Sequence, residues 1–580
     1  MRTPSATPRG TADDASGASG ARAAEEHQDP RAPGADTPET SETSETSDTA
    51  FTDASPGRFL ARATLVTAVL SVAGALLGLG RDQALAHFFG AGAATDAFLV
   101  AWTLPEMAST LLIEDGMAFL LVPAFSVALA RRAAGSASPD PVRALVAASL
   151  PRLCLAFAAV AGLLVAGAPL LVGVLAPGLP HPRLAVACTR LTATCVLSFG
   201  LAGYCSAALR AHRSYLAPAT IYVTYNATII AAMFAVGARW GVRSAALGVA
   251  LGGCLLVAVQ APSLWRRITE RPDRPAAGYR PNGEQPLTPA PALVLAVLLF
   301  ALCRQSQVLI ERHFASLLPV GAISHLNYAQ KIGQLPMSLA LMLCVVTFPV
   351  LARAMAEGDT RRARDRIERD LVMVTAIVLL GAAEIWACAP QIVQLLFQRG
   401  AFGAQDTVAT ANVMRVYTLG LLGHTLVGAL VRSYFSAGRT TWYPTGVMAV
   451  GMVVTAVISA WTVGIWGACG IAAANCAGIT LTALLLLCGL GSRSVAVRVR
   501  RVGVELAKPV ASAVGAAVAG FVCARSFASP PAAVTAGCLG VVAVYLPLLW
   551  ALDVAGARSL VPTALLTVRR LLTRKQSHGR

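Results

Sequence analysis

Apolar residues occur in long runs that are separated by short polar segments. Two examples are 156–176 (AFAAVAGLLVAGAPLLVGVLA) and 371–390 (LVMVTAIVLLGAAEIWACAP). A helix needs about 20 consecutive apolar residues to cross a bilayer, and runs of this length recur along the chain. The pattern predicts an all-α polytopic membrane protein with about fourteen transmembrane helices. They are expected near 60–88, 94–130, 144–175, 185–210, 215–238, 242–265, 288–315, 320–352, 371–397, 408–436, 443–464, 466–490, 505–526 and 532–552.

Arginine residues are distributed unevenly between the polar segments. Segments that follow even-numbered spans are rich in arginine, whereas those that follow odd-numbered spans are nearly bare of it. Basic residues accumulate on the cytoplasmic side of membrane proteins. We therefore expect both termini and the loops 266–285 and 353–370 to be cytoplasmic in a multi-pass protein of the inner (plasma) membrane. The basic segments contain Arg131, Arg132 and Arg143; Arg266, Arg267, Arg271, Arg274 and Arg280; Arg353, Arg361, Arg362, Arg364, Arg366 and Arg369; and Arg493, Arg498, Arg500, Arg501 and Lys508.

Composition supports the membrane class. Hydrophobic residues make up 56% of the 580 residues and charged residues 13%, whereas soluble proteins carry about 25% charged residues. The first 57 residues differ, with four arginines against eleven acidic residues and many Ala, Ser, Thr and Pro. This composition cannot bury a core, so a disordered acidic cytoplasmic tail is expected. The net charge of +17 lies in loops between spans, which membrane topology explains better than a nucleic-acid partner.

The sequence also repeats itself at low identity. Six features recur in the same order, and each repeat holds six spans, so both copies keep the same orientation. Such a parallel repeat predicts two six-helix lobes that expose a central cleft alternately to the two sides. We expect domains at 1–57 (acidic tail), 58–266 (first lobe), 267–287 (cytoplasmic linker), 288–490 (second lobe), 491–555 (two extra helices) and 556–580 (basic tail). The matching pairs are Arg81 with Arg312, Leu104-Pro105 with Leu335-Pro336, Val122-Pro123 with Phe348-Pro349, Arg213 with Arg439, Pro218 with Pro444, and Trp240-Gly241 with Trp466-Gly467.

Ionisable residues concentrate in the first two spans of each lobe. Such residues are costly at membrane depth and usually functional. We expect Arg81 and Lys331 to approach the same central cavity, and Asp96 to lie on the cavity side of its span, where water can solvate it. Lys331 is the most informative, because it lies in mid-span, five residues before Pro336, among polar neighbours that suggest a wet cavity. The histidines and the thirteen cysteines form no catalytic or metal-binding spacing, so neither an enzyme nor a cofactor is expected. The ionisable residues are Arg81, Asp82, Asp96, Glu106, Glu114 and Asp115 in the first lobe, and Arg304, Glu311, Arg312, His313, His325 and Lys331 in the second.

Several of these residues lie in runs that resemble the MviN/MurJ family of lipid II flippases, within the multidrug/oligosaccharidyl-lipid/polysaccharide exporter superfamily. The runs are Gly80-Arg81-Asp82, Ala86–Gly92, Thr95-Asp96-Ala97-Phe98 and Leu104-Pro105, followed by Glu114 and Val122-Pro123. In the second lobe they are Asn327–Lys331 with Leu335-Pro336, and Gln398–Phe402. The resemblance covers roughly residues 58–555, and fourteen spans in a six-six-two layout are the family's architecture.

The resemblance implies transport of a polyprenyl-diphosphate-linked peptidoglycan precursor, driven by ion gradients or membrane potential rather than ATP. It implies substrate-binding roles for Arg81, Asp96, Glu114 and Lys331, and a lipid-tail groove for the last two helices. The sequence departs from the family where Lys331 replaces an arginine. Ala75 and Ser109 likewise stand where the family has arginine, and Thr110 replaces a basic residue.

Other functions stay open beside this flippase. The substrate could be another lipid-linked glycan, or a small amphiphile or drug exported by cation antiport. Alternatively, the chain could be a non-transporting membrane scaffold whose acidic tail recruits a cytoplasmic partner. Arg81 and Lys331 favour an anionic headgroup over a cationic drug. The expected partners are thus a lipid-linked glycan and membrane lipid.

Overall fold

The computed structural model describes residues 56–133, 140–269, 291–356, 359–435, 441–493, 497–554 and 558. Helices joined by short turns make up these described residues, and no strand occurs among them. The predicted all-α class is therefore confirmed. The predicted tails at 1–57 and 556–580 and the linker at 267–287 lie almost entirely outside the described residues.

The N-lobe comprises the helices that precede residue 270. Its second expected span is divided among α2, the π-helix η1 and α3, the third between α4 and α5, and the fourth between α6 and α7. The elements are α1 (Pro56–Phe89), α2 (Ala93–Ala108), η1 (Ser109–Asp115), α3 (Gly116–Ala133), α4 (Pro141–Ala166), α5 (Ala168–Leu175), α6 (Pro182–Ala193), α7 (Cys195–Ala211), α8 (Leu216–Trp240) and α9 (Arg243–Thr269).

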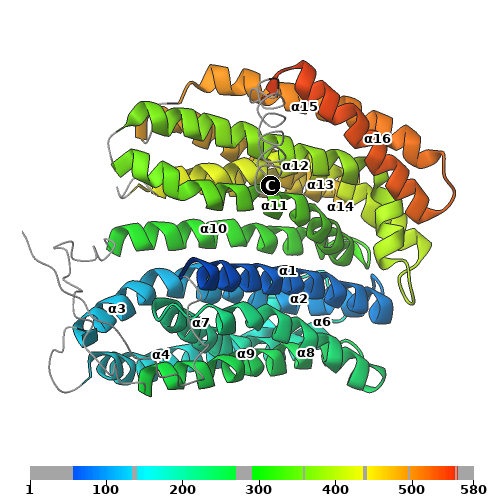
Figure 1. Ribbon diagram of the computed structural model, residues 1–580. Helices are drawn as coiled ribbons and strands as arrows, with labels where there is room; N and C mark the ends of the chain where they lie inside the picture. Colours follow the sequence, from blue (N-terminus) through cyan, green and yellow to red (C-terminus); the bar gives the residue numbers. More distant parts are fainter. Residues whose placement is uncertain are drawn as a thin grey trace, which may run out of the picture. The chain divides into compact units, whose positions relative to one another are not determined.

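The C-lobe follows, and two further helices pack on its outer side. α15 and α16 contact each other and α12, so they lie away from the N-lobe (Figure 1). Two expected spans form the single element α14, in which Gly467 breaks the helical geometry. The elements are α10 (Pro291–Ala315), α11 (Ala322–Ala356), α12 (Thr360–Phe397), α13 (Ala404–Phe435), α14 (Tyr443–Arg493), α15 (Val499–Arg525) and α16 (Pro530–Ala551).

The predicted parallel repeat is visible in the helix contacts. The first helix of each lobe packs on the helix that contains the fifth span, as α1 on α8 and α10 on α14, and α3 on α7 corresponds to α11 on α13. The matching Trp-Gly positions also adopt the same turn, with φ of 56° at both Gly241 and Gly467 and ψ of −143° and −134°. Such a positive φ favours glycine, which lacks a Cβ. The two lobes therefore share local geometry as well as helix order.

Ten helices in the described part of the chain are long and apolar enough to cross a membrane. α1, α10 and α11 each carry an ionisable residue of the pocket between the lobes, respectively Arg81, Arg304 and Lys331. These three helices therefore bring charge to the interior of the fold.

Candidate functional site

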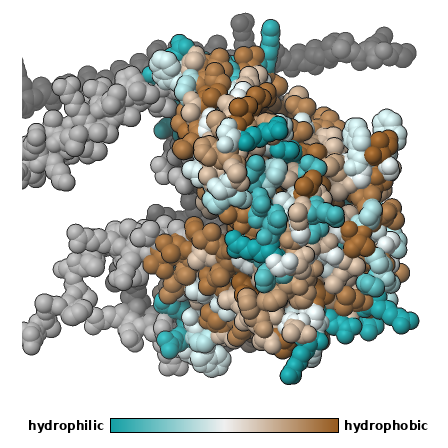
Figure 2. Space-filling model, turned by 90° about the vertical axis from the view of Figure 1, so that its right-hand side faces the viewer, coloured by the Kyte–Doolittle hydropathy of each residue, from teal (hydrophilic) through white to brown (hydrophobic). Residues whose placement is uncertain are grey.

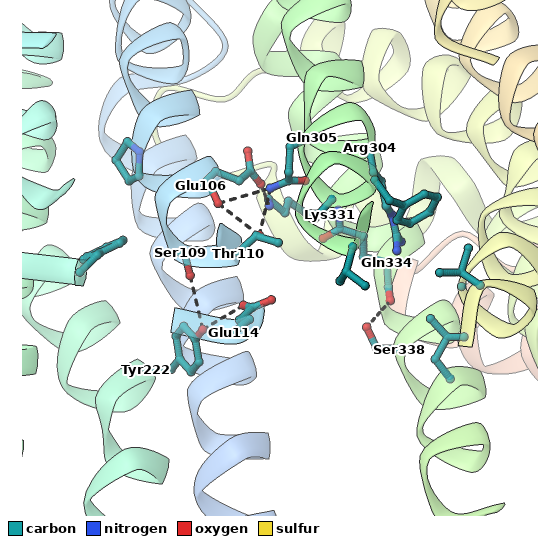
Figure 3. A pocket seen from close by; sticks show the side chains of 18 of the residues that line it. Glu106, Ser109, Thr110, Glu114, Tyr222, Arg304, Gln305, Lys331, Gln334 and Ser338 are labelled. Carbon is teal, nitrogen blue, oxygen red and sulfur yellow. Dashed lines mark hydrogen bonds and ion pairs between the residues drawn. The ribbon is translucent and has the colours of Figure 1, made fainter. Parts of the chain in front are cut away.

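A pocket of about 860 Å³ lies between the two lobes. The N-lobe contributes α1, α2, η1, α7 and α8 to its wall, and the C-lobe contributes α10, α11 and α13 (Figure 3). One part of the wall is apolar, with Leu293, Val297 and Phe300 from α10. The polar and charged lining residues are Arg81, Glu106, Ser109, Thr110, Glu114, Tyr222, Asn226, Arg304, Gln305, Lys331, Gln334, Ser338 and Arg432.

A local change of helix type shapes the N-lobe side of the pocket. Pro105 lies inside α2, and the π-helix η1 begins four residues later. A proline removes a backbone donor, and short π-helical segments are frequent at functional sites. η1 carries Ser109 and Glu114 into the wall, where the Tyr222 hydroxyl donates a 2.9 Å hydrogen bond to Glu114 Oε1. The exposed Glu114 carboxylate is thereby held at the pocket surface.

Arg81 lines the pocket but is held by the N-lobe itself. Its guanidinium forms an ion pair of 2.7 Å with Asp82 and donates to Asn226 Oδ1 at 3.1 Å. It also lies over the Trp102 ring, 4.2 Å from the centroid. The charge of Arg81 is therefore largely balanced by its own lobe. Arg312, its counterpart in the repeat, is 1% exposed and donates to Asn327 and the Ile323 carbonyl, which makes it a structural residue.

Lys331 bridges the two lobes inside the pocket. Its ammonium donates to Glu106 Oε1 at 2.6 Å, with about a fifth of each side chain exposed. Nearby, Gln305 Nε2 donates to Thr110 Oγ1 at 2.9 Å and to the Glu106 carbonyl at 3.4 Å. The contacts join α2 and η1 to α10 and α11, as Figure 3 shows. Arg81 and Lys331 therefore line the same cavity, as predicted. In this conformation Lys331 already forms an ion pair with Glu106.

Asp96 lies outside this pocket. We expected it on the cavity side of its span, solvated by water, and that expectation is wrong because Asp96 is 4% exposed. Its carboxylate accepts hydrogen bonds from the Gly321 amide at 2.7 Å, the Ser324 amide at 2.9 Å and the Ser324 hydroxyl at 2.6 Å. The carboxylate thus caps the first turn of α11 from the opposite lobe, where backbone N–H groups lack helical partners.

Further contacts close the same end of the cleft, which we call the sealed end. The Ala401 amide donates to the His87 carbonyl at 2.9 Å, and His313 Nδ1 lies 2.9 Å from the Val174 carbonyl. Gly90 has φ of 63°, and a Cβ there would lie 2.5 Å from the Ala401 oxygen. At this end the two lobes therefore contact each other through backbone atoms. Figure 2 views the molecule from this side, where polar residues gather across the centre and apolar residues lie around them.

Sequence reasoning missed several pocket residues. Tyr222, Asn226 and Arg432 lie on later spans and were not singled out, although each interrupts an apolar run. Their isolation along the chain hid them, because the helices that bring them to the cleft belong to different parts of the fold. An isolated polar residue in mid-span was the available signal.

The chain is similar to known proteins over most of its length. The family described as "Lipid II flippase MurJ" matches residues 85–533. The lipid II flippase MurJ of Burkholderia cenocepacia is 28% identical over 447 residues, which cover 75% of this chain and 84% of the relative. A probable lipid II flippase MurJ of Rhizobium meliloti is 28% identical over 382 residues, covering 63% of this chain and 68% of the relative.

Solved structures show the same fold. A lipid II flippase MurJ in an inward closed conformation aligns with a TM-score of 0.69 at 18% identity, covering 86% of this chain and 100% of the other. An inward-facing multidrug resistance transporter of the MATE family aligns with a TM-score of 0.56 at 14% identity, covering 76% and 98%. At these identities the likeness concerns the fold alone.

Proposed function

Since the chain belongs to the Lipid II flippase MurJ family, we propose that it moves a polyprenyl-diphosphate-linked peptidoglycan precursor across the inner membrane. The observation that carries this proposal is the pocket between the lobes, which is closed at one end and carries three basic residues on its C-lobe wall. They are Arg304, Lys331 and Arg432. A diphosphate headgroup would bind there, because guanidinium groups supply paired donors to phosphate oxygens and an ammonium supplies a compact charge.

The geometry favours transport by alternating access. The pocket lies between lobes that are tied together at the sealed end, so the substrate would enter from the opposite side. Release would then require the Asp96 contacts with α11 to break and the lobes to rock apart. In this scheme Arg81, Glu114 and Lys331 act in substrate binding, and Asp96 acts in closure.

The orientation follows from the arginine distribution. We place the ends of α3 and α9, which carry Arg131, Arg132, Arg266 and Arg267, on the cytoplasmic side, together with both termini. The sealed end then faces outward, and the pocket opens toward the cytoplasm where the precursor is made. Membrane-impermeant thiol labelling of single cysteines introduced at 267–287 and at 91 tests this. Labelling of the 267–287 position from outside intact cells would reverse the assignment.

Cation-coupled export of an amphiphile is the second candidate. It is favoured by one observation, the presence of two carboxylates, Glu106 and Glu114, in the pocket wall. Carboxylates in a transporter cavity can bind a cationic substrate. The three basic residues of the C-lobe wall oppose this reading, since they would repel such a compound.

Transport by purified protein in liposomes decides between these functions. The assay follows a fluorescent polyprenyl-diphosphate disaccharide-pentapeptide, with a polyprenyl phosphate sugar and a quaternary ammonium dye as the competing substrates. We expect only the diphosphate compound to cross at a rate above that of empty liposomes. Exclusive transport of the cationic dye would refute the flippase proposal.

A further inference from the structure

The charges of the pocket are separated between its two walls. On the N-lobe wall, Arg81 pairs with Asp82, and the acidic lining residues among those described are Glu106 and Glu114. On the C-lobe wall the ionisable lining residues among those described are all basic, namely Arg304, Lys331 and Arg432. Figure 3 shows the carboxylates on α2 and η1 facing Arg304 and Lys331 on α10 and α11. The pocket therefore presents an acidic wall opposite a basic one.

The two walls meet at the Lys331–Glu106 ion pair of 2.6 Å. A substrate that carries only negative charge would have to take Lys331 from Glu106 and leave the carboxylate without its partner. Glu106 is only about a fifth exposed, and a partly buried charge without a counter-ion is strongly unfavourable. Binding of an exclusively anionic headgroup to the C-lobe wall is therefore disfavoured, because it leaves the Glu106 carboxylate on the N-lobe wall unpaired. A charge left unpaired by the wrong ligand is one way in which a site gains specificity.

A headgroup with charges of both signs avoids this penalty. Its anion would pair with Lys331 while its cation replaces the ammonium beside Glu106, so one internal ion pair is exchanged for two intermolecular ones. Glu114 extends the acidic wall, because it lies in η1 two turns from Glu106 and its carboxylate is exposed at the pocket surface. A protonated primary amine is a cation suited to such carboxylates, since it carries three donors and can hydrogen-bond to more than one acceptor.

We propose that this pocket selects lipid-linked diphosphates whose headgroup also bears a free primary amine. The diphosphate binds the C-lobe wall, and the amine binds Glu106 and Glu114. This inference rests on the proposed flippase function and adds a requirement to it. It makes Glu106 and Glu114 specificity-determining residues, and it assigns a role to acidic groups that a pure diphosphate site would not contain.

The test uses one synthetic substrate in two forms. The first is a polyprenyl-diphosphate disaccharide-pentapeptide with lysine as the third residue of its peptide, and the second carries the same lysine acetylated on its side-chain nitrogen. The flipping rates in proteoliposomes are compared at sub-saturating concentration. We expect the free-amine form to flip about tenfold faster, since one charge-assisted contact separates the two forms.

Two variants locate the selectivity. Glu114→Gln should lower the ratio of the two rates toward one, because the amine loses a charged acceptor. Glu106→Gln should raise the rate of the acetylated form, because a neutral glutamine leaves no stranded charge when the diphosphate takes Lys331. The matched control is Glu384→Gln, a partly buried carboxylate of α12 that does not line the pocket. It should leave the ratio as in the wild type.

The outcomes separate the two proposals. Equal wild-type rates for both forms, well above empty liposomes, would overturn the amine requirement and leave the flippase function standing. A wild-type ratio that Glu114→Gln and Glu106→Gln both leave unchanged would also overturn it. Transport of neither form would contradict the flippase function itself, provided that a cooperative thermal unfolding transition shows the protein to be folded.

Discussion

Two regions hold the lobes together, and they do so by different means. At the sealed end, Asp96 accepts three hydrogen bonds from the other lobe, and two of them come from backbone amides. Inside the pocket, the lobes are joined by the side-chain contacts of Lys331 with Glu106 and of Gln305 with α2 and η1. The Asp96 contacts of the sealed end are buried, whereas the pocket contacts are partly exposed.

The difference indicates which contacts determine the conformation and which respond to substrate. Buried contacts to backbone have no substitute partner, so losing them is costly. Apolar side chains of both lobes add to the sealed end, because one buried cluster contains Leu85 and Phe98 together with Tyr328 and Phe402. The pocket contacts can be replaced by a substrate's own charges. Stability of the closed state should therefore depend mainly on the sealed end.

Asp96→Ala should have the largest effect. It removes all three acceptor contacts and leaves the Gly321 and Ser324 amides without a partner, at a cost of about 3–5 kcal/mol to the closed arrangement. Hydrogen–deuterium exchange in nanodiscs should then be at least about a hundredfold faster at these two amides.

The control for this variant is Asp140→Ala, which removes a cap within the N-lobe. Asp140 accepts from the Val142 amide at 2.9 Å and pairs with Arg132. Its loss should speed exchange at the start of α4 but not at Gly321 and Ser324. Unchanged exchange at the latter two residues in Asp96→Ala would mean that Asp96 does not hold the sealed end.

Gly90→Ala should have the second-largest effect. Alanine is strained at φ of 63°, and its Cβ would lie 2.5 Å from the Ala401 oxygen. Together these should destabilise the closed state by about 2–4 kcal/mol. Thermal unfolding should occur at a lower temperature, while Gly162→Ala, where nothing lies within 4 Å, should change it little. A wild-type unfolding temperature in Gly90→Ala would show that the sealed end can shift without cost.

The sequence predicted the large-scale arrangement because that arrangement depends on simple periodic features. Apolar runs of span length located the helices, and the repeat grouped them into two lobes. The interruptions within spans escaped this reasoning. The π-helix at Ser109–Asp115 and the break at Gly167 both lie inside expected spans, so a search for apolar runs of span length did not locate them.

The pocket was predicted in part for a similar reason. Arg81, Glu114 and Lys331 were placed at the cleft because ionisable groups at membrane depth have few alternatives. The position of Asp96 was wrong because its partners are backbone amides near residue 321, and backbone donors leave no sequence pattern. The pairing of Glu106 with Lys331 depends on how closely the lobes approach, which no single helix encodes.

Lys331→Met should affect binding rather than closure. It removes a charge-assisted contact to the diphosphate and leaves Glu106 without its partner, so substrate affinity should fall by about ten- to a hundredfold. Lys331→Arg should retain or improve flipping, since it keeps the charge and adds a parallel donor. Both are measured as flipping rates at matched membrane abundance. Full activity in Lys331→Met would remove the lysine from the diphosphate site.

Gln305→Ala should have the smallest effect, and it tests whether the pocket contacts are individually weak. Gln305 Nε2 donates to Thr110 Oγ1 at 2.9 Å, a neutral hydrogen bond beside partly exposed groups. Such a bond contributes about 0.5–1.5 kcal/mol, so the flipping rate should change by less than about tenfold.

A double-mutant cycle with Thr110→Val isolates the contact between the lobes, because both single variants remove the same bond. If the comparison holds, the double variant should differ little from either single one, with a coupling free energy of about 1 kcal/mol. Ser306→Ala serves as the control on the same helix, since Ser306 donates only to the Leu302 carbonyl of α10. A coupling free energy above about 3 kcal/mol would make the Gln305 contact as strong as the Asp96 contacts. The pocket contacts would then determine the closed conformation as much as the sealed end does, which would contradict the comparison.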